Sequence, residues 1–252
     1  MRMVVALVAC LVLGTRAGAQ SAGDIAAFNA LTFTPVGGLP PIMTSTIAAD
    51  VQRSAQFSIR YGYTSGGPRD VLFGNGDLNA FGFSGVFPMG LGSTVTLTGG
   101  VASPECGNCD PGLMLGIGGD MRLTTMPMGP DREAARLTIS LNGEFGFGKP
   151  KLPFDIVSSV WSGAVGLPIG LVSGGRNAGM RIVPFITPAF GFGNVDFTDD
   201  EFDSESGSRF MLGGGVGVYN RTSSVVLNLG FQYVAIDHGG TQIGLALTLG
   251  GR

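Results

Sequence analysis

The chain has 252 residues, of which 44 are glycine and only 13% are charged, and its formal net charge is −3. Its mean hydropathy is positive, +0.34, yet after the N-terminus no apolar run reaches the roughly 18 residues that a membrane-spanning helix needs. These values exclude an α-helical membrane protein, and glycine without a three-residue period excludes collagen. A mildly acidic balance gives no reason to expect nucleic acid as a partner.

The first residues have the pattern of a secretory signal peptide. Arg2 precedes an apolar stretch, and the small residues Ala17–Ala19 follow it, so we expect cleavage before Gln20 and removal of residues 1–19. Removal would change the net charge to 13 − 18 = −5. The alternative is a lipobox at Leu7–Cys10, although the apolar run continues past that cysteine. Either interpretation predicts an exported chain.

Residues 20–53 show no sustained period, and we expect an irregular N-terminal segment there. From residue 54 to the end, alternate residues are apolar, which is typical of strands with one oily and one polar face. Pro184 and Pro188 interrupt one of these stretches, and each removes a ladder donor, so we expect a bulge or an irregular stretch there. The predicted strands are 54–63, 78–87, 94–102, 113–123, 135–148, 160–171, 181–192, 209–219, 225–234 and 241–249.

Short and long links tend to alternate along this series. The links at 88–93 and 220–224 are as short as turns, whereas those at 124–134 and 172–180 are of intermediate length and make the alternation less regular. An even barrel with both termini on the short-turn side gives this arrangement. We therefore predict an all-β fold over residues 54–252: a closed antiparallel up-and-down transmembrane β-barrel of about ten strands, with eight or twelve as the alternatives. We expect residues 20–53 to lie in or across its periplasmic mouth.

The aromatic residues support this orientation. When strand directions are assigned from the links alone, twelve aromatic residues fall near the long-loop ends, on the aliphatic face, as an aromatic girdle at one membrane interface does. They are Tyr61, Tyr63, Phe81, Phe83, Phe145, Phe147, Trp161, Phe190, Phe192, Phe210, Phe231 and Tyr233.

The opposite rows carry the charged side chains. An Arg that faces the bilayer midplane costs about 2–4 kcal/mol, so the rows with Arg60, Asp120, Arg122, Arg136 and Glu144 should face the lumen. Because the strands at 113–123 and 135–148 are neighbours, we expect Asp120 and Arg122 to lie near Arg136, in an ion cluster toward the periplasmic end.

The cysteines of one predicted loop, Cys106 and Cys109, are expected to form a disulfide in an exported chain. The alternative is half of a metal site, for which the sequence offers no second cysteine pair. An acidic loop holds a weak candidate site for a hard cation such as Ca²⁺, but its spacing lacks the glycine of an EF-hand and equally suits a solvated loop. The candidate ligands are Asp199, Glu201, Asp203 and Glu205.

His238 follows Asp237 in a glycine-rich link. A catalytic His needs a nucleophile or water within hydrogen-bond reach, so this pair predicts a rim hydrolase only as an alternative. Several lumen rows consist mostly of small residues, and a barrel of about ten strands lined in this way leaves either a narrow passage or space for a plug.

The signal peptide, repeated alternation, alternating links and aromatic rim together resemble the small outer-membrane β-barrel proteins of Gram-negative-type bacteria. The resemblance covers residues 54–252 and implies insertion by the barrel-assembly machinery and residence in outer-membrane lipid, without a cofactor. Such barrels usually end on an aromatic residue, whereas here the last apolar residue of the pattern is Leu249. We expect a non-enzymatic barrel, either structural or a narrow passive pore for small solutes, with a surface binding protein that acts through its long loops as the alternative.

Overall fold

The computed structural model describes residues 31, 55–65, 77–90, 92–105, 109–128, 135–152, 156–173, 180–199, 203–221, 225–236 and 240–251. The side chains of residues 219–240 are outside this description, as are the predicted signal peptide and all of the N-terminal segment except Leu31.

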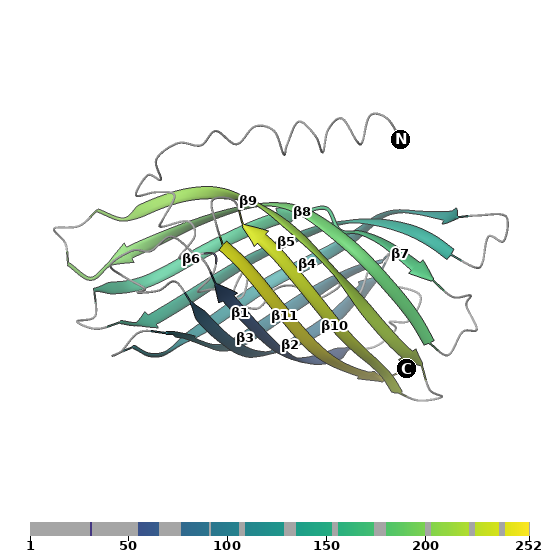
Figure 1. Ribbon diagram of the computed structural model, residues 1–252, viewed down its shortest axis with the longest axis horizontal. Helices are drawn as coiled ribbons and strands as arrows, with labels where there is room; N and C mark the ends of the chain where they lie inside the picture. The colour runs from purple at the N-terminus through teal and green to yellow at the C-terminus, as the bar shows by residue number, and fades with distance from the viewer. Residues whose placement is uncertain are drawn as a thin grey trace.

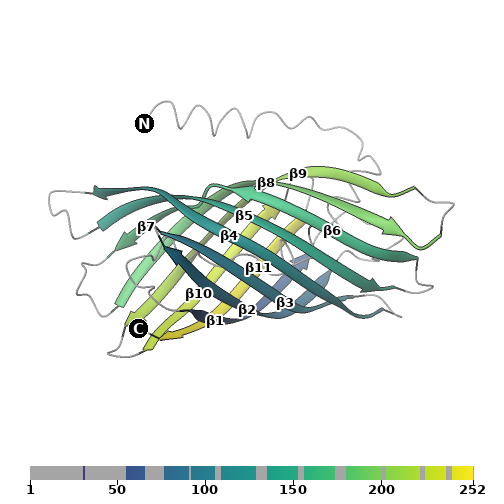
Figure 2. The same ribbon diagram turned by 180° about the vertical axis from the view of Figure 1, so that it is seen from behind.

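Eleven antiparallel strand segments form one closed wall (Figures 1 and 2). Each of the ten predicted strands overlaps a strand of this wall, so the predicted fold class is confirmed. The segments are β1 (Gln56–Ser65), β2 (Leu78–Gly90), β3 (Ser93–Pro104), β4 (Asp110–Met128), β5 (Ala135–Lys151), β6 (Val157–Gly166), β7 (Ile169–Ser173), β8 (Met180–Phe197), β9 (Glu205–Arg221), β10 (Val225–Ile236) and β11 (Gly240–Gly251).

β6 and β7 are two halves of one strand, as the sequence predicts. Gly166 pairs with Ala189, and Ile169 pairs with Ile186. Both strands therefore advance by three residues across the break at residues 167–168, and the register does not shift. The barrel accordingly has ten strands.

Two prolines explain the break. The Leu167 amide donates to the Pro188 carbonyl at 2.9 Å, and the Ser140 amide donates to the Pro168 carbonyl at 2.9 Å. The N and O of an antiparallel strand residue point to the same neighbour, so Pro188 faces Leu167 and Pro168 faces Ser140 without a donor. The predicted irregularity at Pro184 and Pro188 is thus placed differently. The β8–β9 ladder is regular there, and the interruption lies in the strand opposite.

The closure between β1 and β11 fixes the shape of the barrel. Ladder partners followed from Arg60 through β2 to β6 reach Val195 on β8. Partners followed the other way, through β11, β10 and β9, reach Val183 on the same strand. The shear number is therefore 195 − 183 = 12 for ten strands. This value corresponds to a strand tilt of about 40° and a backbone radius of about 10 Å.

The two ends of the barrel differ in their links. We call the end with links 91–92 and 222–224 the turn end, and the end with links 66–77 and 198–204 the loop end. At the turn end, Gly90 and Gly92 adopt positive φ values of 85° and 78°, which favour glycine. The Ser93 hydroxyl donates to the Gly90 carbonyl at 2.6 Å, which closes the hairpin.

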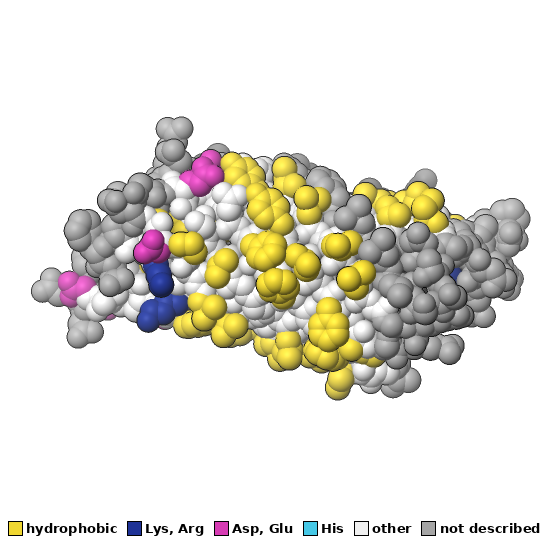
Figure 3. All heavy atoms as spheres, turned by 90° about the horizontal axis from the view of Figure 1, so that it is seen from below, with side chains coloured by type: hydrophobic (Ala, Val, Ile, Leu, Met, Phe, Trp, Pro, Cys, Tyr) yellow, Lys and Arg dark blue, Asp and Glu magenta, His cyan; other side chains and the backbone are white. Residues whose placement is uncertain are grey.

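The outside of the wall is apolar. Leu137 and Ile139 are partly exposed and Leu141 is 37% exposed, so the aliphatic row of β5 faces outward as predicted. Figure 3 shows apolar side chains across the middle of the barrel and most of the visible charged ones toward one end. A closed barrel with an apolar exterior matches a membrane-spanning fold. Within the described ranges, no helix is long and apolar enough to cross a membrane.

Candidate functional site

A charged layer crosses the middle of the lumen. Ladder partners followed from Arg60 through β2, β3 and β4 lead to Gly148 on β5. Because the strands are tilted, residues at equal height along the barrel axis shift by about 1.2 positions from one strand to the next. Over four strands the shift is about five positions, so the β5 residue at the height of Arg60 lies close to Glu144. β1 and β5 are four strands apart in a ten-stranded wall, which puts these two residues on nearly opposite sides. Arg60 is buried and interacts electrostatically with Glu144 and Asp120. These three side chains therefore lie in one layer of the lumen.

Neighbouring residues position the carboxylate side chains of Asp120 and Glu144. Asn142, the ladder partner of Asp120, donates to its Oδ1 at 3.3 Å. Glu144 pairs with Gly118, and a Cβ on Gly118 would lie 2.7 Å from the Glu144 Cγ. Glycine at position 118 thus leaves the space through which the Glu144 side chain enters the lumen.

The other two residues of the predicted ion cluster lie elsewhere. Arg122 lies beside the turn, where its Nε is 3.0 Å from the ideal Cβ position of Gly92. Arg136 pairs with Pro127, six residues along β5 from the partner of Asp120, or about 20 Å. β4 continues to Met128, well into the predicted link at 124–134, and the resulting register separates Arg136 from Asp120.

Two lumen arginines were not singled out from the sequence. Arg181 and Arg209 are buried, with 4% and 2% of their surface exposed. Arg209 extends the lumen row that contains Met211 and the glycines of β9, so the alternation contained the signal. Within the described part of the chain, the buried arginines of the barrel interior therefore range from Arg181 near the turn end to Arg209 on the loop-end side of the charged layer.

Leu31, the described residue of the N-terminal segment, lies inside the barrel. It is fully buried and packs with Ala164, Ala189 and Met211. Its Cδ2 lies 2.8 Å from the ideal Cβ position of Gly191. All four of these wall residues belong to lumen rows, so Leu31 sits near the middle of the lumen, deeper than the predicted position at the mouth.

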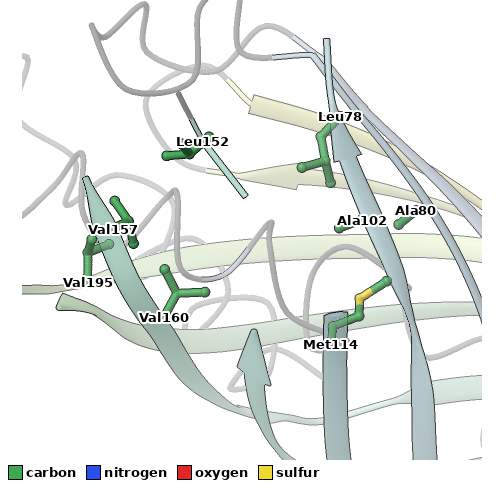
Figure 4. Close-up of a cluster of buried hydrophobic side chains, with 8 residues drawn as sticks. All are labelled: Leu78, Ala80, Ala102, Met114, Leu152, Val157, Val160 and Val195. Atoms are coloured by element: carbon green, nitrogen blue, oxygen red, sulfur yellow. The ribbon is translucent and has the colours of Figure 1, made fainter. Parts of the chain in front are cut away.

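Near the loop end, apolar side chains from several strands are buried inside the barrel. Figure 4 shows Val157, Val160 and Val195 on one side and Leu78 and Met114 on the other. We call the whole group the apolar lumen cluster. Its members are Leu78, Ala80, Ala102, Met114, Leu152, Val157, Val160 and Val195, and all of them are buried.

Hydroxyl and amide groups line the wall around the closure of the barrel. Ser58 and Thr248 are hydrogen-bonded at 2.7 Å, and the Gln242 amide donates to the Thr64 hydroxyl at 3.0 Å. These bonds satisfy polar groups that are buried from water, and they join the first strand to the last.

Aromatic side chains lie close together on the outer face toward the loop end, where they are described. Trp161 stacks on Phe145 with ring centroids 6.1 Å apart and meets Phe192 edge-on, also at 6.1 Å. Phe81 and Phe83 make a third contact at 5.4 Å. Most of the predicted members are exposed or half-buried on the outer face. The side chains of Phe231 and Tyr233 lie outside the described residues.

The loop candidates are only partly described. Cys109 is disulfide-bonded, whereas its predicted partner Cys106 lies outside the described residues, as do Glu201 and His238. Among the described residues, no three His, Cys, Asp or Glu side chains group as a metal site would require. The alternatives of a cation site and a rim hydrolase therefore remain predictions.

No protein-family model and no curated protein matches the sequence. Several solved bacterial outer-membrane barrels are similar in structure. The attachment invasion locus protein Ail of Yersinia pestis is 14% identical, covering 78% of this chain and 96% of that one, with a TM-score of 0.34. The transport unit of the Escherichia coli autotransporter AIDA-I is 13% identical, covering 93% and 100%, with a TM-score of 0.42.

The N-terminal β-barrel domain of Pseudomonas aeruginosa OprF is 12% identical, covering 79% of this chain and 98% of that one, with a TM-score of 0.29. The barrel itself follows from the strand pairing, in which the first strand is the neighbour of the last.

Proposed function

We propose that this chain is an integral outer-membrane β-barrel protein with a structural role, whose lumen is closed to solutes in this conformation. One observation carries the proposal: lumen-facing side chains are buried at three successive levels. Arg60 is 5% exposed in the middle layer, Leu31 is fully buried above it, and Met114 is fully buried near the loop end. A water-filled channel would expose all three.

The outer membrane is the proposed location. The apolar exterior requires lipid, and an antiparallel barrel is the form in which strands cross a membrane without unpaired edges. The predicted signal peptide supports export, and insertion by the barrel-assembly machinery follows from the same proposal. Membrane fractionation of cells that express the full chain tests the location, and recovery in the periplasmic soluble fraction would contradict it.

Conductance across a planar bilayer tests the closed lumen. We expect the folded full-length protein to give no steps of uniform size, and vesicles that contain it to admit small sugars no faster than vesicles without protein. Heat-unfolded protein at the same concentration identifies non-specific leakage. Uniform steps that increase in number with the amount of folded protein would show an open pore and overturn the proposal.

A further inference from the structure

Both lysines of the chain lie at one place on the outer wall. Lys149 and Lys151 end β5 and are exposed. They share the outward row with Phe145 and Phe147, because residues two apart on a strand point to the same side. The spacing along the strand puts their Cα atoms about 7 Å apart. The row thus passes from aromatic rings to two cations at the loop end of the barrel.

The surroundings of the lysines combine apolar and polar contacts. Lys149 pairs with Leu113 on β4, and Phe147, the outward residue before it, pairs with Trp161 on β6. Trp161 in turn stacks on Phe145 at 6.1 Å. Aromatic rings of this kind mark the level at which hydrocarbon gives way to headgroups. In the outer-membrane location proposed above, on which this inference rests, the two ammonium groups stand at headgroup level, directly beyond rings that face the acyl chains.

The nearest described carboxylates leave the lysines available. Asp110 is the ladder partner of Lys151, and within the described residues no ion pair joins the two. Asp196 is engaged by the Ser159 hydroxyl at 3.0 Å and by the Asn194 amide at 2.7 Å. Elsewhere in the described residues the arginine side chains are buried or half-buried, so this pair is the cationic feature of the described outer surface.

We propose that Lys149 and Lys151, together with the ring surface of Phe147 and Trp161, form a binding site for an anionic lipid with a phosphate-bearing headgroup. The ammonium groups bind the phosphate, and the acyl chains lie along the rings below. A cation beside an anionic membrane surface contributes about a five-fold gain in local lipid concentration, and screening by salt reduces it. The site is independent of the state of the lumen.

The single tryptophan of the chain provides the readout, because Trp161 lies within the proposed site. The full-length protein is refolded into phosphatidylcholine vesicles that contain either brominated phosphatidylglycerol or brominated phosphatidylcholine at the same mole fraction. Bromine quenches tryptophan fluorescence on contact, so the ratio of the two quenching levels reports enrichment of the anionic lipid. We expect several-fold enrichment in the wild-type protein and a ratio near one in the double variant K149Q/K151Q.

Arg122→Gln is the matched control, because it removes a cation at the turn end of the barrel and should leave the ratio unchanged. The double variant should unfold at the same urea concentration as the wild type, since both side chains are exposed. Equal quenching by both brominated lipids in the wild type, or enrichment that survives K149Q/K151Q, would overturn the proposal. Loss of enrichment on adding inorganic phosphate, but not sodium chloride of equal ionic strength, would identify a free-phosphate site instead of a lipid site.

Discussion

The position of Leu31 inside the barrel can be tested through its contact with Gly191. A methyl group on Gly191 would lie 2.8 Å from the Leu31 Cδ2 and 3.0 Å from the Met211 Cε. Both distances are below normal carbon contact, but both atoms end flexible side chains. Gly191→Ala should therefore lower the free energy of unfolding by about 1 kcal/mol, the lower end of the cost of overpacking. Leu31→Ala should lower it by about 2–5 kcal/mol, because the side chain is fully buried.

The double variant decides the question. Leu31→Ala removes the atom closest to the new methyl group, so the double variant should be about 1 kcal/mol more stable than the sum of the single effects predicts. Unfolding by urea in phospholipid vesicles, followed by Trp161 fluorescence, measures all four free energies. Gly143→Ala is the matched glycine control, because no atom lies within 4 Å of its ideal Cβ position. Single effects that add to within about 0.5 kcal/mol would refute the contact and with it the position of Leu31.

Three further predictions concern the wall and the charged layer, and urea unfolding in vesicles measures each. Arg60→Ala should lower the free energy of unfolding by about 1–3 kcal/mol, because it removes a buried cation that interacts with both Glu144 and Asp120. Pro188→Ala should raise it by about 1 kcal/mol, because the new amide can donate to the Leu167 carbonyl inside the membrane. Ile117→Arg should lower it by about 2–4 kcal/mol, because this exposed side chain faces lipid at the level of the charged layer.

Each of these changes has its own check. Replacing Arg60 and Glu144 together by Met and Gln should cost much less than Arg60→Ala, and an equal cost would show that the pairing contributes little. A loss of stability in Pro188→Ala would show that packing of the ring outweighs the missing hydrogen bond. Met126→Arg, near the turn end, should cost at most about 1 kcal/mol. A cost as large as that of Ile117→Arg would contradict the assignment of the membrane midplane.

The wall was predictable because its signal is local. Alternation places each side chain on one of the two faces of the wall. A shift of one residue in the register of a strand would move all of its apolar side chains from the outer face to the lumen. The exact strand ends were not predictable in the same way, since β4 and β5 continue beyond the membrane, where polar and apolar residues no longer need to alternate. The break opposite Pro188 also depends on which neighbour each proline nitrogen faces, and that follows from the pairing and not from the sequence of one strand.

The interior was predictable only in part, because it depends on the shear. The rows that face the lumen identified Arg60, Asp120 and Glu144 as interior charges, but only the stagger of twelve residues brings β1 and β5 to one level across the barrel. The register of the β4–β5 hairpin, which was also not predicted, separates Arg136 from Asp120. Leu31 carries no periodic signal of its own, and its position results from long-range packing.

The first and last strands of the chain are neighbours, and this has a consequence for how the protein is made. Ser58 and Thr248 are 190 residues apart in the sequence, yet their side chains are hydrogen-bonded. Until β11 is in place, β1 and β10 each present an unpaired edge, and the polar interior is not enclosed. The polypeptide must therefore be kept from associating with other chains until β11 has paired with both. Loss of this twelve-residue strand would open the wall, so that the barrel would no longer separate its inside from its outside.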